Sequence, residues 1–165
     1  FGKWCKPNYN SVVATFCHNK AHDLPVQIND ASARVRLVYV DDVVTAMIGQ
    51  LAADWTGVAR PTIEPEYTIT LGELSAQIDA FKNCRSTLVS ERVGTGLTRA
   101  LYATYVSYLP FEKFAYNVPA HGDERGVFVE MLKMMYNEAF EIAAGEDREK
   151  AAVRLVPRQQ FIGST

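Results

Sequence analysis

The sequence has few cysteines, no long apolar run and no concentration of one charge. Its three cysteines, Cys5, Cys17 and Cys84, form no CxxC pair and leave one thiol over in any disulfide pairing. This usage is typical of a reducing compartment. No stretch approaches the roughly 18 consecutive apolar residues of a transmembrane helix, and no signal-peptide pattern opens the chain. We therefore expect a cytoplasmic protein with no membrane partner.

Charge is nearly balanced, with 17 basic and 19 acidic residues and a formal net charge of −2. The basic residues are scattered and form no stripe, so we expect no nucleic-acid partner. With 165 residues, 48% of them hydrophobic, the chain is long and apolar enough to bury a core. Phe1 opens the chain where an initiator Met would stand, so we expect a fragment whose upstream half is missing.

The sequence also lacks the common signatures of catalytic and metal sites. It contains no GxGxxG loop, P-loop, HExxH or GxSxG elbow, and no Cys/His cluster has zinc-ligand spacing. Its histidines, His18, His22 and His121, are scattered along the chain, and solvated histidines are common. The sequence therefore predicts no catalytic residue and no metal site in this chain.

What the sequence does contain is an alternation of helical and strand patterns. Asn10 or Ser11 is placed to cap the first helix, and Thr70 with Glu73 fits a capping box. Helices are expected over 12–21, after Asp41-Asp42, after Thr70 and over 94–109, and strands over 26–28, 35–40 and 66–69. This order predicts an α/β fold.

Beyond residue 112 the sequence changes character. A polar turn entering a strand is expected over 121–130, followed by a helical stripe over 131–142 and a solvated charge run over 145–150. We therefore expect two domains, residues 1–112 and residues 113–165.

Several segments resemble one family of enzymes. The stretch Val-Tyr-Val-Asp-Asp-Val-Val over 38–44 resembles a motif of extended short-chain dehydrogenases/reductases that act on nucleotide sugars, and Phe1-Gly2 resembles the pair after their catalytic segment. Residues 1–19, 71–81, 101–114 and 123–130 resemble the bifunctional capsular-polysaccharide UDP-sugar enzymes, which join a reductase domain to a C-terminal cupin. The resemblance implies the C-terminal substrate-binding part of an extended Rossmann-type reductase, followed by a truncated start of a cupin-like β domain.

The resemblance also implies a UDP-sugar site. Carried over to this sequence, it nominates Asn10, Ser11, Gln27 and Arg36 for the diphosphate and base. Helix N-termini and guanidinium groups do bind phosphate oxygens, but simple capping and a solvent-facing Arg explain the same residues equally well. Arg34 is an alternative to Arg36, because many relatives carry their Arg at the position of Val35.

Two further roles follow from the resemblance. Arg125 lies in the stretch Asp-Glu-Arg-Gly-Val-Phe-Val-Glu over 123–130, which resembles the entry strand of sugar-nucleotide cupin epimerases, where the Arg contacts substrate. Asp41 and Asp42 could split their pKa values as a general-acid pair. The family instead implies a structural role, in which they cap the helix and tie the strand to a loop.

The expected function is thus the UDP-sugar-binding part of an NAD(P)-dependent nucleotide-sugar reductase or epimerase of capsular or surface polysaccharide biosynthesis. NAD(P) is implied for the full-length protein, with no cofactor for this chain alone and no activity without the missing N-terminal Rossmann half. A homodimer is a further expectation. The alternative is a non-catalytic interaction module, in which the helix with Tyr102, Tyr105 and Tyr108 packs on a partner.

Overall fold

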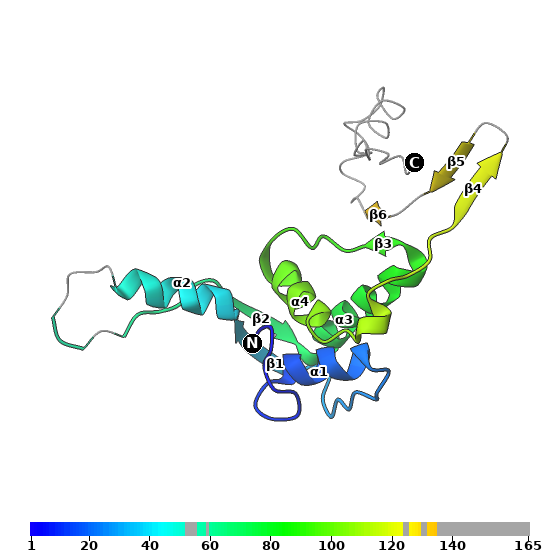
Figure 1. Cartoon of the computed structure of the whole chain (residues 1–165). Helices are drawn as coiled ribbons and strands as arrows, with labels where there is room; N and C mark the ends of the chain where they lie inside the picture. Colours follow the sequence, from blue (N-terminus) through cyan, green and yellow to red (C-terminus); the bar gives the residue numbers. More distant parts are fainter. Residues whose placement is uncertain (52–55, 59, 124–125, 130–131, 135–165) are drawn as a thin grey trace, which may run out of the picture. The chain divides into compact units, whose positions relative to one another are not determined.

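The computed structural model describes residues 1–51, 56–58, 60–123, 126–129 and 132–134 (Figure 1). The chain divides into two compact units, residues 1–134 and residues 135–165, and the second lies outside the described residues. The first unit mixes helices and short strands, which confirms the expected α/β class. The expected domain boundary between residues 112 and 113 stays a prediction.

Three helices, α1 (Val12–Ala21), α3 (Leu71–Thr87) and α4 (Gly96–Val106), pack against one another around the main hydrophobic core (Figure 1). Val13, Ile78 and Leu101, one from each helix, are fully buried there. Burial of a side chain of this size stabilises the fold by about 1.5–3 kcal/mol. Packing among the three helices therefore stabilises this part of the fold.

One antiparallel pair of strands packs on this core. β1 (Arg34–Val38) pairs with β2 (Glu66–Thr70), with Arg36 opposite Thr68. Successive side chains of a strand point to opposite faces, so Leu37 joins the core while Arg36 lies exposed on the other face.

Strand β2 runs directly into α3 through the predicted capping box. The Glu73 backbone N–H donates to Thr70 Oγ1 over 3.2 Å, and the Thr70 N–H donates to Glu73 Oε2 over 3.0 Å. The two bonds satisfy donors that the helix start would otherwise leave free. This local signal was read correctly from the sequence.

Helix α2 (Val40–Leu51) follows β1 after a single residue, and none of its 12 residues is buried. Its apolar side chains Val44, Met47, Ile48 and Leu51 are all exposed. Asp41 and Asp42 lie inside its first turn, not at the capping position predicted for them, because the helix already begins at Val40.

The remaining elements are short. β3 (Val89–Ser90) pairs in parallel with β6 (Lys133–Met134), the 3₁₀ helix η1 spans Phe111–Lys113, and β4 (Ala120–Asp123) pairs antiparallel with β5 (Gly126–Val129). Strand β5 confirms the strand expected within 121–130, but residues 121–123, expected in the polar turn, belong to strand β4. Residues 124, 125 and 130 lie outside the described part.

Two predictions of elements were wrong. Residues 26–28 form no strand, and Val26 and Ile28 are apolar because they pack against the helical core. Met134 belongs to β6 and not to a helix, because its backbone pairs with β3. The rest of the expected stripe from residue 135 on, and the charge run over 145–150, lie outside the described residues.

Candidate functional site

The loop from Gly2 to Asn10 leads into the N-terminus of α1, where two of the nominated residues lie. Ser11 is the capping residue, and its Oγ accepts a hydrogen bond from the Ala14 backbone N–H over 3.2 Å. Asn10 is exposed next to it, with no side-chain hydrogen bond inside the described ranges. Ser11 is thus the residue that caps α1, and the Asn10 side-chain amide is left to donate to a ligand.

The loop is held in place by contacts with distant parts of the chain. The Asn8 backbone N–H donates to Thr15 Oγ1 over 2.9 Å, and the Tyr108 hydroxyl donates to the Cys5 carbonyl. Gly2 is buried, and a Cβ there would lie 2.2 Å from Val40 Cγ1. Only glycine therefore allows the loop to pass this close to the start of α2.

The first turn of α1 carries no acidic residue, whereas the first turn of α2 carries two and that of α3 carries Glu73. Unpaired N–H groups give a helix N-terminus a partial positive charge, which a nearby carboxylate would offset. Of these three helices, α1 is thus the one whose N-terminus an external anion could approach without meeting a carboxylate of the same turn.

Tyr39 lies between β1 and α2 and is fully buried. Its ring lies 5.5 Å from that of Phe1 and 5.7 Å from Arg99 Cζ, measured between ring centroids and from the centroid to the cation. Burial raises the pKa of its hydroxyl, and the nearby Asp41 carboxylate adds to the shift. In the part of the chain that the structure describes, this hydroxyl has no hydrogen-bond partner.

Asp41, the first residue of the Asp pair, takes part in this arrangement through a salt bridge. Lys3 Nζ lies 3.2 Å from Asp41 Oδ2, and Asp41 chiefly raises the pKa of Lys3. The contact ties the loop to the start of α2, as the structural interpretation of Asp41 predicted. Sequence analysis did not nominate Lys3, Tyr39 or Arg99, because nothing local relates positions so far apart in the chain.

Arg36 is already engaged with a carboxylate from the neighbouring strand. Its Nε and Nη2 donate to the two Glu66 oxygens over 2.7 and 2.6 Å, while its side chain remains 77% exposed. The pair lowers the pKa of Glu66 and raises that of Arg36. A phosphate would have to use the remaining N–H groups of Arg36 or displace Glu66.

The other nominated residues lie apart from this strand. Gln27 is exposed in the segment between α1 and β1, where its Nε2 donates to Asn29 Oδ1 over 3.3 Å. No hydrogen bond or ion pair between described residues joins Gln27 or Arg36 to the Asn10 loop. Arg125 lies outside the described residues. The nominated set as a whole stays a prediction.

Tyr102 and Tyr105 of α4, and Tyr108 just after it, lie in the core or pack against it. Tyr105 is buried, and the Tyr102 ring packs at 5.2 Å, centroid to centroid, against Phe81 of α3. Tyr108 donates to the Cys5 carbonyl and meets His18 edge-on at 6.2 Å between ring centroids. This packing weakens the interpretation of α4 as a docking helix for a partner protein.

Known proteins share this architecture. Over 80–81% of its length the chain matches crystal structures of the capsular polysaccharide assembling protein CapF, at 38% identity. The TM-score is 0.74 for CapF from Staphylococcus aureus and 0.72 for CapF with the inhibitor 3-isopropenyl-tropolone, and the match covers 37% and 38% of those chains. The chain is thus an α/β relative of capsular polysaccharide proteins.

A match to one enzyme narrows the class of related proteins further. Over 133 residues the chain is 53% identical to the UDP-2-acetamido-2,6-beta-L-arabino-hexul-4-ose reductase of Pseudomonas aeruginosa, a match that covers 81% of this chain and 36% of that protein. No protein-family profile matches the chain. The predicted resemblance to capsular UDP-sugar reductases is confirmed, and the chain spans little more than a third of the relatives it matches.

Proposed function

We propose that this chain supplies the UDP-sugar-binding surface of an NAD(P)-dependent nucleotide-sugar reductase of capsular or surface polysaccharide biosynthesis. The observation that carries the proposal is its 53% identity to a UDP-sugar reductase. In the whole protein the nicotinamide cofactor supplies or accepts a hydride at the sugar. No catalytic residue and no cofactor site is assigned to this chain, whose part is to hold and orient the nucleotide.

The N-terminus of α1 is where the diphosphate binds in this proposal. Its first-turn N–H groups other than that of Ala14, which the Ser11 cap occupies, are donors, as is the free Asn10 amide. No carboxylate of that turn competes with phosphate. Lys6 adds positive charge along the same loop, whereas Lys3 is already paired with Asp41. Arg36 and Gln27 remain candidates for the rest of the nucleotide.

Titration calorimetry of the full-length protein with UDP tests the proposal. We expect saturable binding that Asn10→Ala weakens about tenfold, the effect of one hydrogen bond to a charged group. Asn83→Ala, at an exposed position of α3, is the matched control and should leave the affinity unchanged. Arg34→Gln and Arg36→Gln, measured side by side, decide which arginine meets phosphate. No heat at millimolar UDP contradicts the proposed function.

The partner in this proposal is the N-terminal Rossmann half of the same protein. Helix α2 supports it, because Met47, Ile48 and Leu51 form an exposed apolar stripe that an isolated domain would leave in water. Native-state hydrogen exchange is the test. Amides of α2 should exchange much more slowly in the full-length protein than in residues 1–165 alone, while those of α3 serve as the internal reference. Equal protection of α2 in both would contradict this partner.

Two finer parts of the proposal concern the C-terminal segment and the assembly. Residues 113–165 are proposed as the start of a cupin-like domain with Arg125 at its substrate, and the β4–β5 hairpin is compatible with such a start. A homodimer is proposed for the full-length protein, and its mass in solution, measured by light scattering, checks it.

A further inference from the structure

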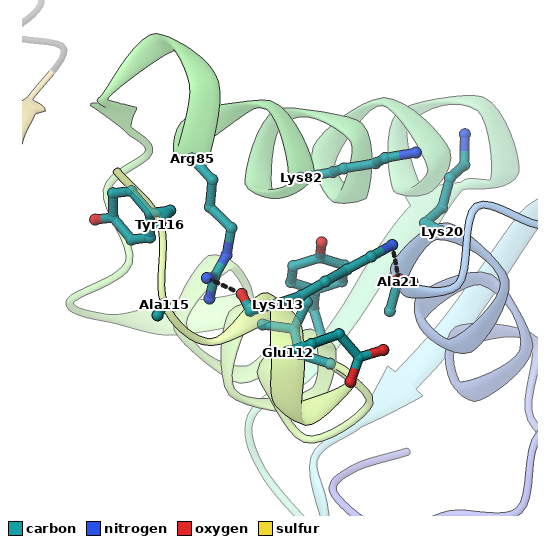
Figure 2. Close-up of a pocket in the computed structure, with 10 residues that line it drawn as sticks. Lys20, Ala21, Lys82, Arg85, Glu112, Lys113, Ala115 and Tyr116 are labelled. Carbon is teal, nitrogen blue, oxygen red and sulfur yellow. Dashed lines mark hydrogen bonds between the residues drawn. The ribbon is translucent and has the colours of Figure 1, made fainter. Parts of the chain in front are cut away.

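A cavity of about 310 Å³ lies between the end of α1, the second half of α3, the end of α4 and η1 (Figure 2). The side chains that line it include Lys20, Lys82, Arg85, Tyr105 and Lys113. None of Asn10, Ser11, Gln27 and Arg36 lines it. The cavity is therefore separate from the residues proposed for the nucleotide, and its volume is at the lower end of small-molecule sites.

Positive charge dominates the lining. Lys20 lies 2.7 Å from Asp79, and Lys82 and Lys113 each lie 2.5 Å from Asp23, measured between the charged atoms. Among the described residues that line the cavity, Glu112 is the single carboxylate, and it is exposed. Four cations thus face three carboxylates in and around the cavity, which leaves one positive charge unmatched.

Arg85 is the cation whose charge is not matched by an ion pair with a described carboxylate. Its Nη1 donates to the backbone carbonyls of Lys113 and Phe114, the latter over 2.9 Å, and its Cζ lies 5.3 Å from the Tyr116 ring centroid. Figure 2 shows the Arg85 side chain reaching from α3 toward Lys113. These contacts fix the guanidinium while leaving its Nε and Nη2 donors without a described partner.

Tyr105 adds a polar group at the same place. It lines the cavity although only 2% of its surface is exposed, and within the described ranges its hydroxyl makes no hydrogen bond. Burial raises its pKa to about 12, so it carries its proton at neutral pH and can donate. Among the described residues only the Tyr39 hydroxyl is both buried and unpaired, so the Tyr105 hydroxyl is accessible from the cavity, where it can donate to a ligand oxygen.

We propose that this cavity binds the phosphoryl group of a small metabolite, with Arg85 and Tyr105 donating to its oxygens. Lys82 and Lys113 share the single carboxylate of Asp23 and add positive charge beside them. A tetrahedral dianion has acceptor oxygens in several directions, which suits donors that come from α3 and α4. A planar carboxylate has the same acceptor chemistry but fewer oxygens, so it binds more weakly. The site is additional to the proposed nucleotide site.

Titration calorimetry of the full-length protein with inorganic phosphate, in the absence of UDP, tests the site. We expect one saturable site with a Kd of about 1 mM or tighter, and weaker binding of acetate. Arg85→Gln should weaken phosphate binding at least about tenfold, because it removes a charged donor. Arg92→Gln removes the same charge from an exposed position outside the cavity and should change the affinity by less than about twofold.

Arg85→Gln could also disturb the backbone at Lys113 and Phe114, to which Arg85 donates hydrogen bonds. Two more variants test the site without removing these bonds. Tyr105→Phe removes only the hydroxyl and should weaken phosphate binding about three- to tenfold. Glu112→Gln removes the one lining carboxylate and should tighten it. Absence of saturable phosphate binding, or equal losses in Arg85→Gln and Arg92→Gln, overturns the site. Loss of UDP binding in Arg85→Gln also overturns it, because the cavity would then be part of the nucleotide site.

Discussion

The three packed helices and α2 all carry apolar side chains, but these side chains have opposite environments. In α1, α3 and α4 the apolar residues meet one another, and Leu101 is completely buried. In α2 the side chains of Val44, Met47, Ile48 and Leu51 are exposed within the described part, and Leu51 is 87% exposed. The difference teaches that a helical stripe predicts that a face will be covered, whereas the covering surface can lie in another part of the protein.

The largest expected effect is a difference in the free energy of unfolding when the same Leu→Ala substitution is made in each of these two regions. In residues 1–165, Leu101→Ala should lower the free energy of unfolding by about 2–5 kcal/mol, because it leaves a cavity in the core. Leu51→Ala should change it by less than about 0.5 kcal/mol, because the side chain is already in water. Urea denaturation followed by circular dichroism measures both. A large loss in Leu51→Ala would mean that α2 is covered within this chain.

A smaller effect is expected at the start of α3, where the local signal is strongest. Thr70→Ala removes the side-chain oxygen that accepts from the Glu73 N–H, so we expect a loss of about 1 kcal/mol in the free energy of unfolding. Thr45→Ala, in exposed α2, is the matched control and should cost less than half as much. Equal effects in the two variants would show that the box adds nothing beyond helix propensity.

The smallest effect concerns pH and the salt bridges beside the cavity. Lys113 and Lys82 hold the pKa of Asp23 at about 2, below its ordinary value of 3.8. A carboxyl with a lowered folded-state pKa stabilises the fold above the unfolded-state value, and this contribution is lost as pH falls through the folded-state value. Stability should therefore drop slightly between about pH 4 and pH 2.

Thermal unfolding measured over this pH range checks the expectation. Asp23→Asn should reduce the loss of stability between about pH 4 and pH 2. Asp42→Asn in α2 is the control and should reduce this loss less than Asp23→Asn does. Because Asp23 is exposed, solvent screening keeps the effect small. An acid limb identical to that of the parent protein in Asp23→Asn would show that the two lysines do not stabilise the fold through this carboxylate.

Elements set by neighbouring residues were predicted well from the sequence. The cap of α1 was predicted at Asn10 or Ser11 and is found at Ser11. This cap, the Thr70–Glu73 box and the strand before Asp41 depend on residues a few positions apart, so their pattern is visible in the chain itself. The segment 26–28 was mistaken for a strand, because a short apolar run looks the same whether it pairs with a strand or packs on helices.

The sequence by itself determined the α/β order, the starts of α1 and α3 and the resemblance to capsular UDP-sugar reductases. Only the tertiary structure decided that Arg36 meets Glu66, since this depends on the register that places Val38 opposite Glu66. It also brought Arg85 and Tyr105 from separate helices to one cavity. Helix caps and the spacing of apolar residues are local properties of a chain. Side-chain contacts and cavities depend on how distant segments pack.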